Sequence, residues 1–191
     1  MPDLRIAVVG PESSGKTALV DHLSQWLRDR DVPVVVVEEQ GRLLAERLPP
    51  GHPWSYREQV ATSLLHQSAE AAAAVILRAG GDGGLVVCDG TAATPAVWHI
   101  CAVRNREGYD AGPAEITGRL LQAAGQPYDL VFLLTPDLPW VDDGVRDDPE
   151  GREEAFDEYR RLYPDAVVIS GEDRRDQAIR ILEQRLPDVT S

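Results

Sequence analysis

The chain has 191 residues, of which 43% are hydrophobic and 27% are charged, so it can build one substantial core and has the balance of an ordinary folded protein. Its 19 basic and 32 acidic residues give a formal net charge of −13, which argues against a nucleic-acid binder and against an anionic membrane surface as partner. No uninterrupted apolar run has the length of a membrane span, and the two cysteines suit a reducing compartment, so we expect a single cytoplasmic domain over residues 1–191.

Short apolar runs alternate along the chain with segments of helical periodicity, which is the pattern of an α/β domain with a mainly parallel sheet. The apolar runs predict strands at Leu4–Val9, Val34–Val37, Leu85–Cys88, Leu130–Leu134 and Val167–Ile169. Helices are predicted, in order, around the stripe of Leu19, Leu23 and Leu27, over Gly41–Leu48, Ser55–Leu77, Pro95–Val103 and Ala114–Ala124, from Pro149 after an Asp148 cap, and over Asp173–Leu186. These elements predict five parallel strands joined by crossover helices.

The turn after the first predicted strand carries a complete phosphate-loop motif. Residues 10–17 read Gly-Pro-Glu-Ser-Ser-Gly-Lys-Thr, which matches G-x-x-x-x-G-K-[ST] between a strand and a helix. Backbone N–H groups of such a loop form an anion site, the lysine reaches the β- and γ-phosphates, and the hydroxyl after it ligates Mg²⁺. Lys16 is the only lysine in the chain. The sequence therefore predicts that ATP is bound by Gly10, Glu12, Ser13, Ser14, Gly15, Lys16, Thr17 and Ala18.

Acidic residues end two of the predicted strands. Asp89 follows the third strand and is expected to face Mg²⁺ or the acceptor hydroxyl, together with Thr17 as the other metal ligand. Glu39 closes the second strand on the side of the cleft, because period-two alternation turns Glu38 the other way. Either Glu39 or Asp89 can accept the proton of an attacking hydroxyl. Arg42 is expected to bind the acceptor or to pair with Glu39.

Planar side chains are candidates for stacking on a nucleoside base. Trp140 is the first candidate, followed by Trp54 and Tyr56 in the turn before the long helix. Trp26 and Trp98 fall on apolar helical stripes, and we assign both to the core.

Arginines near the predicted site are candidates for contacts to the nucleotide. Arg146, in the acidic loop Asp137–Asp148, is expected to stabilise the migrating phosphoryl group, and Arg152 is a second candidate. Arg174 either flanks adenine or is a charge at the start of the last helix. The histidines and cysteines show no spacing typical of a zinc site, so none is expected.

Several classes of phosphate-loop protein do not fit this sequence. The absence of a second lysine excludes the Asn/Thr-Lys-x-Asp motif with which GTPases read guanine. An oligomeric AAA+ motor needs a further helical domain after its last strand, and a transporter ATPase needs its own signature, which we do not find. The pattern is typical of a small phosphoryl-transfer enzyme, with an acceptor region around Ser55–Leu77 and an arginine-bearing lid at about 137–152.

Four stretches of the chain resemble a known kinase family: Glu12-Ser13-Ser14-Gly15-Lys16, Glu39-Gln40-Gly41-Arg42, His66-Gln67, and Trp140-Val141-Asp142-Asp143-Gly144-Val145-Arg146. Their order and spacing are similar to those of the ribosylnicotinamide kinase domain of NadR-type proteins. The resemblance implies a P-loop fold with strand order 2-3-1-4-5 and a helical lid, and ATP- and Mg²⁺-dependent phosphorylation of a nucleoside 5′-hydroxyl.

The chain departs from that family at Asp89-Gly90-Thr91, where the family has Asp-Thr-Asp, and at Gln40, where it has an aromatic residue. Thr91 therefore stands in the expected acceptor site, and the identity of the acceptor is open. A second hypothesis is a regulatory P-loop ATPase whose nucleotide state controls a protein partner, with water as its only acceptor. The missing second acid favours this alternative, whereas the acceptor-side elements favour a kinase of nucleoside-like small molecules. The sequence gives no indication of the oligomeric state.

Overall fold

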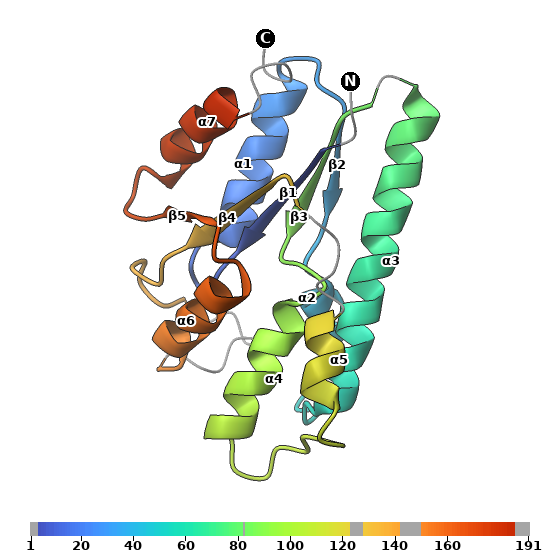
Figure 1. The fold of residues 1–191 in the computed structure, drawn as a ribbon, viewed down its shortest axis with the longest axis vertical. Helices are drawn as coiled ribbons and strands as arrows, with labels where there is room; N and C mark the ends of the chain where they lie inside the picture. Colours follow the sequence, from blue (N-terminus) through green and yellow to red (C-terminus); the bar gives the residue numbers. More distant parts are fainter. Residues whose placement is uncertain (1–3, 82, 123–127, 142–149, 186–191) are drawn as a thin grey trace.

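The computed structural model describes residues 4–81, 83–122, 128–141 and 150–185, which form a parallel sheet between two layers of helices (Figure 1). The strands are β1 (Leu4–Val9), β2 (Val34–Val37), β3 (Leu85–Asp89), β4 (Leu130–Leu134) and β5 (Val167–Ile169). They lie in the order β2-β3-β1-β4-β5, and every pair of neighbours is parallel. The predicted fold class, strands and strand order are therefore confirmed.

The central strand β1 shows why the middle of each strand is apolar. Its side chains alternate between the two faces of the sheet, with Ile6 and Val8 in one core cluster and Ala7 and Val9 in the other. All four are completely buried. Because helices cover both faces, no strand position near the centre can be polar.

Two helices, α1 (Lys16–Arg28) and α7 (Arg174–Arg185), cover one face of the sheet, and the other helices lie on the opposite side (Figure 1). The latter are α2 (Gln40–Ala45), α3 (Tyr56–Gly80), α4 (Thr94–Asn105), α5 (Ile116–Gln122) and α6 (Arg152–Leu162). The start that we predicted for α6 was wrong, since this helix begins at Arg152, directly after Gly151. Asp148 and Pro149 lie outside the described residues.

The long helix α3 forms one wall of the molecule beside the sheet (Figure 1). Ser55 caps it by a reciprocal pair of hydrogen bonds with Glu58, which fixes where the helix begins. By length and composition alone, α3 could cross a membrane, yet it packs on β2 and β3 and contacts α2, α4 and α5. Its inward face buries polar residues, among them Gln59, Thr62 and His66. These polar groups lie at the edge of the cavity described next.

Candidate active site

A cavity of about 700 Å³ opens at the carboxyl ends of the strands, between the first turn of α1 and the helices α2, α3 and α4. Parallel α/β sheets bind their ligands at this edge. Twelve of the predicted site residues line the cavity: Glu12, Ser13, Ser14, Gly15, Lys16, Thr17, Ala18, Glu39, Arg42, Trp54, Asp89 and Thr91. Segments far apart in the sequence thus share one cavity.

The phosphate loop owes its course to two glycines. Gly10 has φ 149°, and a Cβ atom there would lie 2.7 Å from the carbonyl oxygen of Leu134. Gly15 has φ 85° and immediately precedes the first residue of α1. Side chains are disfavoured at both positions, so only glycine lets the loop turn under the helix N-terminus. The amino end of α1 therefore faces the cavity with its positive end.

Lys16 and Thr17 lie on the floor of the cavity. The Lys16 ammonium donates a hydrogen bond of 2.8 Å to the carbonyl oxygen of Pro11, and the Thr17 hydroxyl donates one of 2.6 Å to Oδ2 of Asp89. Among the described residues, no partner hydrogen-bonds to Oδ1 of Asp89, although that atom is buried. The Thr17 hydroxyl and the two carboxylate oxygens of Asp89, one of them without a hydrogen bond from the described residues, are oxygen donors of the kind that Mg²⁺ prefers.

Asp89 is electrostatically unusual. Burial raises the pKa of its carboxyl group, Lys16 opposes this shift, and the charge of Glu39 adds to it. The negative charge of an ionised Asp89 is thus not fully balanced by the described residues, and a cation beside the carboxylate would balance it.

Glu39 and Arg42 lie at the other side of the cavity mouth. Glu39 directly precedes α2, and its Oε2 atom lies 3.8 Å from Nε of Arg42. Both side chains are half-buried and line the cavity. The ion pair holds the Glu39 carboxylate at the cavity without immersing it in the core.

The wall opposite the phosphate loop combines aromatic and polar side chains. Trp54 lies before α3, whereas Trp98 projects from α4, and both line the cavity. The assignment of Trp98 to the core was therefore incomplete, because this half-buried side chain also faces the cavity. Sequence reasoning also missed other members of this wall, namely Gln59, Thr62, His66, Arg106 and Tyr109. Only His66 had a signal, through the His66-Gln67 stretch of the family resemblance.

Thr91 is buried at the end of β3 and is held in a network of hydrogen bonds. Its hydroxyl accepts a hydrogen bond of 2.8 Å from the Tyr163 hydroxyl and one of 3.2 Å from the Ala93 N–H. Its own N–H donates to the Thr94 hydroxyl. The Gly90-Thr91 departure from the family pattern is thus accommodated by a rigid turn at the cavity floor.

Arg174 lies behind the phosphate loop. Its guanidinium, 5% exposed, donates to the carbonyl oxygens of Ser14 at 2.5 Å, Gly171 at 2.8 Å and Thr135 at 3.2 Å, and it pairs with Asp137. It does not line the cavity. These contacts brace the loop from behind, and a contact between Arg174 and adenine stays a prediction.

Arg152, the second predicted lid arginine, also contacts the phosphate loop from outside the cavity. Its guanidinium donates to the carbonyl oxygens of Glu12 at 3.0 Å and Leu138 at 3.0 Å. The Ser13 hydroxyl adds a second link between the loop and this region, since it hydrogen-bonds to the backbone of Val141 at 3.1 Å. Val141 and Arg152, on the two sides of residues 142–149, are thus both attached to the loop.

Two further predicted residues do not line the cavity. Tyr56 lines a second pocket and packs on the backbone of Gly112, so the structure does not bring it to the cavity. Trp140 is half-buried and is not among the lining residues, although its neighbours Pro139 and Val141 are. Arg146 lies outside the described residues.

Comparison with known proteins identifies the type of domain. A family model described as an AAA domain matches residues 5–169. No curated protein matches the sequence.

Solved structures with a similar fold include thymidylate kinases and NadR. A thymidylate kinase from Candida albicans superposes with a TM-score of 0.67 at 17% identity, covering 100% of this chain and 94% of that one. NadR in complex with NR superposes with a TM-score of 0.72 at 21% identity, covering 97% of this chain and 52% of that one. NadR with NAD and AMP-PNP gives a TM-score of 0.70 at 16% identity, with 97% and 50% coverage. The chain thus spans about half the length of NadR, and the predicted resemblance to the P-loop kinase fold of NadR is confirmed.

Proposed function

Because the chain belongs to this AAA-domain family, we propose that it is an ATP- and Mg²⁺-dependent kinase that phosphorylates a hydroxyl group of a nucleoside or nucleoside-like small molecule. Family membership accounts for the phosphate-binding fold, and the acceptor side of the cavity favours a kinase over a motor or a regulatory ATPase. A cytoplasmic location and a lack of nucleic-acid and membrane partners are part of the proposal.

One observation carries the proposal: the cavity continues from the phosphate loop to a wall of aromatic and polar side chains. Trp54 and Trp98 offer flat apolar surface, and Gln59 and Thr62 offer hydrogen-bonding groups beside it. An ATPase that uses water as its only acceptor needs no such wall. A planar ring with polar substituents fits this chemistry, and the names of the structural neighbours suggest the same class.

Phosphoryl transfer needs alignment and charge neutralisation more than covalent chemistry. Lys16 would leave Pro11 for the phosphates of ATP, while Thr17 and Asp89 hold Mg²⁺. When bound, this ion neutralises the charge of the phosphate oxygens. We assign the acceptance of the hydroxyl proton to Glu39, since the carboxylate of Asp89 is already engaged by Thr17. Arg146 keeps its predicted role as a lid arginine.

The experiment that tests the proposal detects the product. Purified protein, ATP and Mg²⁺ are incubated with a panel of nucleosides led by nicotinamide riboside, together with nucleoside monophosphates, and mass spectra are scanned for the addition of a phosphate. We expect one acceptor to gain a phosphate in the wild type and not in a Lys16→Met variant. Consumption of ATP by the wild type with no phosphorylated product would overturn the kinase and favour the regulatory ATPase.

A further inference from the structure

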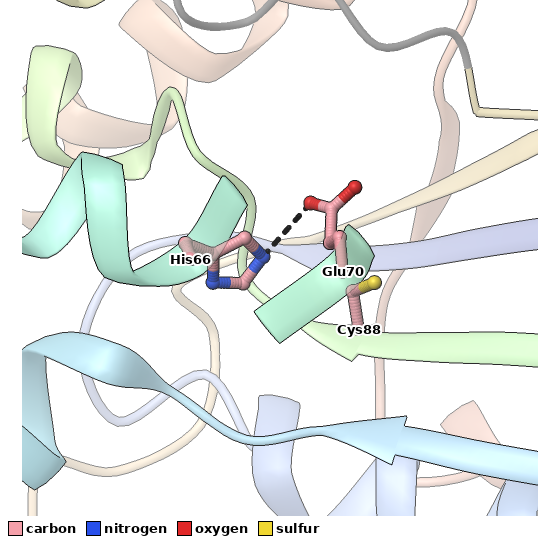
Figure 2. A group of neighbouring side chains, drawn as sticks. All are labelled: His66, Glu70 and Cys88. Carbon is pink, nitrogen blue, oxygen red and sulfur yellow. Dashed lines mark ion pairs between the residues drawn. The ribbon is translucent and has the colours of Figure 1, made fainter. Parts of the chain in front are cut away.

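Three potential metal ligands meet in the interior, outside the cavity floor that holds Thr17 and Asp89. His66 and Glu70 are separated by one turn of α3, and Cys88 projects from β3 toward them (Figure 2). One ligand atom of each residue lies within 4.8 Å of the other two. The side chains are buried, with at most 2% of each residue exposed. An imidazole, a carboxylate and a thiol thus share one small interior volume.

The polar atoms of this cluster are incompletely satisfied. Nε2 of His66 lies 3.1 Å from Oε1 of Glu70, the contact drawn in Figure 2. Even so, within the described part of the chain neither Nε2 of His66 nor Oε2 of Glu70 makes a hydrogen bond. Buried polar atoms are nearly always bonded, so two such atoms side by side point to a missing partner.

A second layer of side chains surrounds the carboxylate. The Tyr128 hydroxyl donates a hydrogen bond of 2.5 Å to Oε1 of Glu70, and the guanidinium of Arg5 lies 3.7 Å from Oε2. Hydrogen-bond donors in this position orient the ligand carboxylates of metal sites. Arg5 also compensates the charge of Glu70 in the metal-free protein.

We propose that His66, Glu70 and Cys88 bind a transition-metal cation of the Zn²⁺ class through one nitrogen, one oxygen and one sulfur atom. This ligand set is soft enough to select Zn²⁺ or Co²⁺ over Mg²⁺ and leaves at least one coordination position for water. Formation of the metal–sulfur bond breaks the S–H bond of Cys88 and releases its proton, with no change in oxidation state. The site shares His66 with the acceptor wall of the cavity and ties α3 to β3.

A Co²⁺ titration tests the site directly. Protein stripped with EDTA is titrated with Co²⁺ in the absence of nucleotide, and the thiolate-to-cobalt charge-transfer band is recorded. We expect a band that saturates at one equivalent and is removed by Zn²⁺. Cys88→Ser should lose the band, whereas Cys101→Ser should keep it, because Cys101 is buried as well but lies outside the cluster.

A variant of a second ligand is needed in case Cys88→Ser disturbs folding. His66→Asn should retain the far-ultraviolet circular dichroism of the wild type and bind Co²⁺ at least about tenfold more weakly. Absence of a saturable band in the wild type, or an unchanged band in Cys88→Ser, would refute the site. Neither readout depends on kinase activity, so failure here is distinct from failure of the proposed function.

Discussion

The two sides of the cavity are built in different ways. The phosphate side comes from one continuous segment, residues 10–17, whose geometry follows from its own glycines and the helix after it. The acceptor side is assembled from separate segments that contribute Trp54, His66, Thr91 and Trp98. The phosphate loop takes its shape from local sequence whenever a strand precedes it and a helix follows it. The acceptor wall, in contrast, forms only when the sheet and the helices pack together. We therefore expect substitutions on the two sides to affect different quantities.

The largest effect is expected on the phosphate side. Lys16→Ala should lower phosphoryl transfer at least about 1,000-fold, because a fixed positive charge on the migrating phosphoryl group is lost. In the folded state Lys16 hydrogen-bonds to a loop carbonyl and its charge partly offsets that of Asp89, so circular dichroism and thermal unfolding serve as the folding controls. Initial rates of product formation measure the effect. Turnover close to that of the wild type would show that the loop does not perform the transfer.

The second effect concerns the brace behind the loop. Arg174→Ala should lower the free energy of unfolding by about 2–3 kcal/mol, since it leaves backbone carbonyls without their buried charged donor. Urea denaturation measures this. Arg175→Ala is the matched control, because the neighbouring side chain is exposed and should shift stability by less than about 0.5 kcal/mol. Equal stability of both variants, with a loss of ATP affinity in Arg174→Ala alone, would support the predicted adenine contact.

The third effect is confined to the acceptor side. Trp98→Ala should raise the KM for the acceptor about tenfold through lost stacking, and the KM for ATP should stay unchanged. Tyr56→Leu serves as the comparison, because Tyr56 lies at the other pocket and should leave the acceptor KM as it is. If Trp98→Ala changed the KM for ATP and not the KM for the acceptor, the wall would belong to the ATP site instead.

The smallest effect is the pH dependence. Burial raises the pKa of Asp89, and its carboxylate form is needed to hold Mg²⁺. Activity should therefore fall on acidification at a higher pH than an ordinary aspartate would give. The free energy of unfolding of the ligand-free protein should change with pH in the direction opposite to activity. Because the folded-state pKa of Asp89 is raised, its contribution to stability is present below the unfolded pKa and is lost as pH rises through the folded-state pKa.

Two profiles check this prediction. The pH dependence of kcat/KM locates the acid limb, and thermal unfolding of the wild type and Asp89→Asn without nucleotide isolates the stability contribution. We expect Asp89→Asn to remove the part of the stability change that belongs to this carboxyl. An acid limb at or below the pH of an ordinary aspartate would contradict the raised pKa.

The contrast between the two sides also explains what the sequence could predict. The positions of the strands follow from apolar runs that are visible in the sequence, whereas their order was implied by the resemblance to the NadR-type kinase domain. Trp98 was placed in the core because a helical stripe has the same spacing whether it faces a core or a cavity. Arg174 gave no sign of its burial, since its partners are carbonyl oxygens of distant segments.

The cluster of His66, Glu70 and Cys88 shows the same limit. Its spacing along α3 is regular, but the third residue comes from β3, which only the folded sheet brings close. A search for metal-ligand spacing within one segment passes over such a site.

The attachment of Arg152 to the phosphate loop has a thermodynamic consequence. Arg152 is the first residue of α6, and it contacts the phosphate loop. Glu154, in the first turn of the same helix, forms an ion pair with Arg104 of α4, the helix that also carries Trp98. A continuous line of contacts therefore joins the two ligand sites. If ATP tightens acceptor binding through this line, the acceptor must tighten ATP binding by the same factor, because binding free energies around a closed cycle sum to zero. Titration with ATP and titration with the acceptor should therefore give the same coupling free energy.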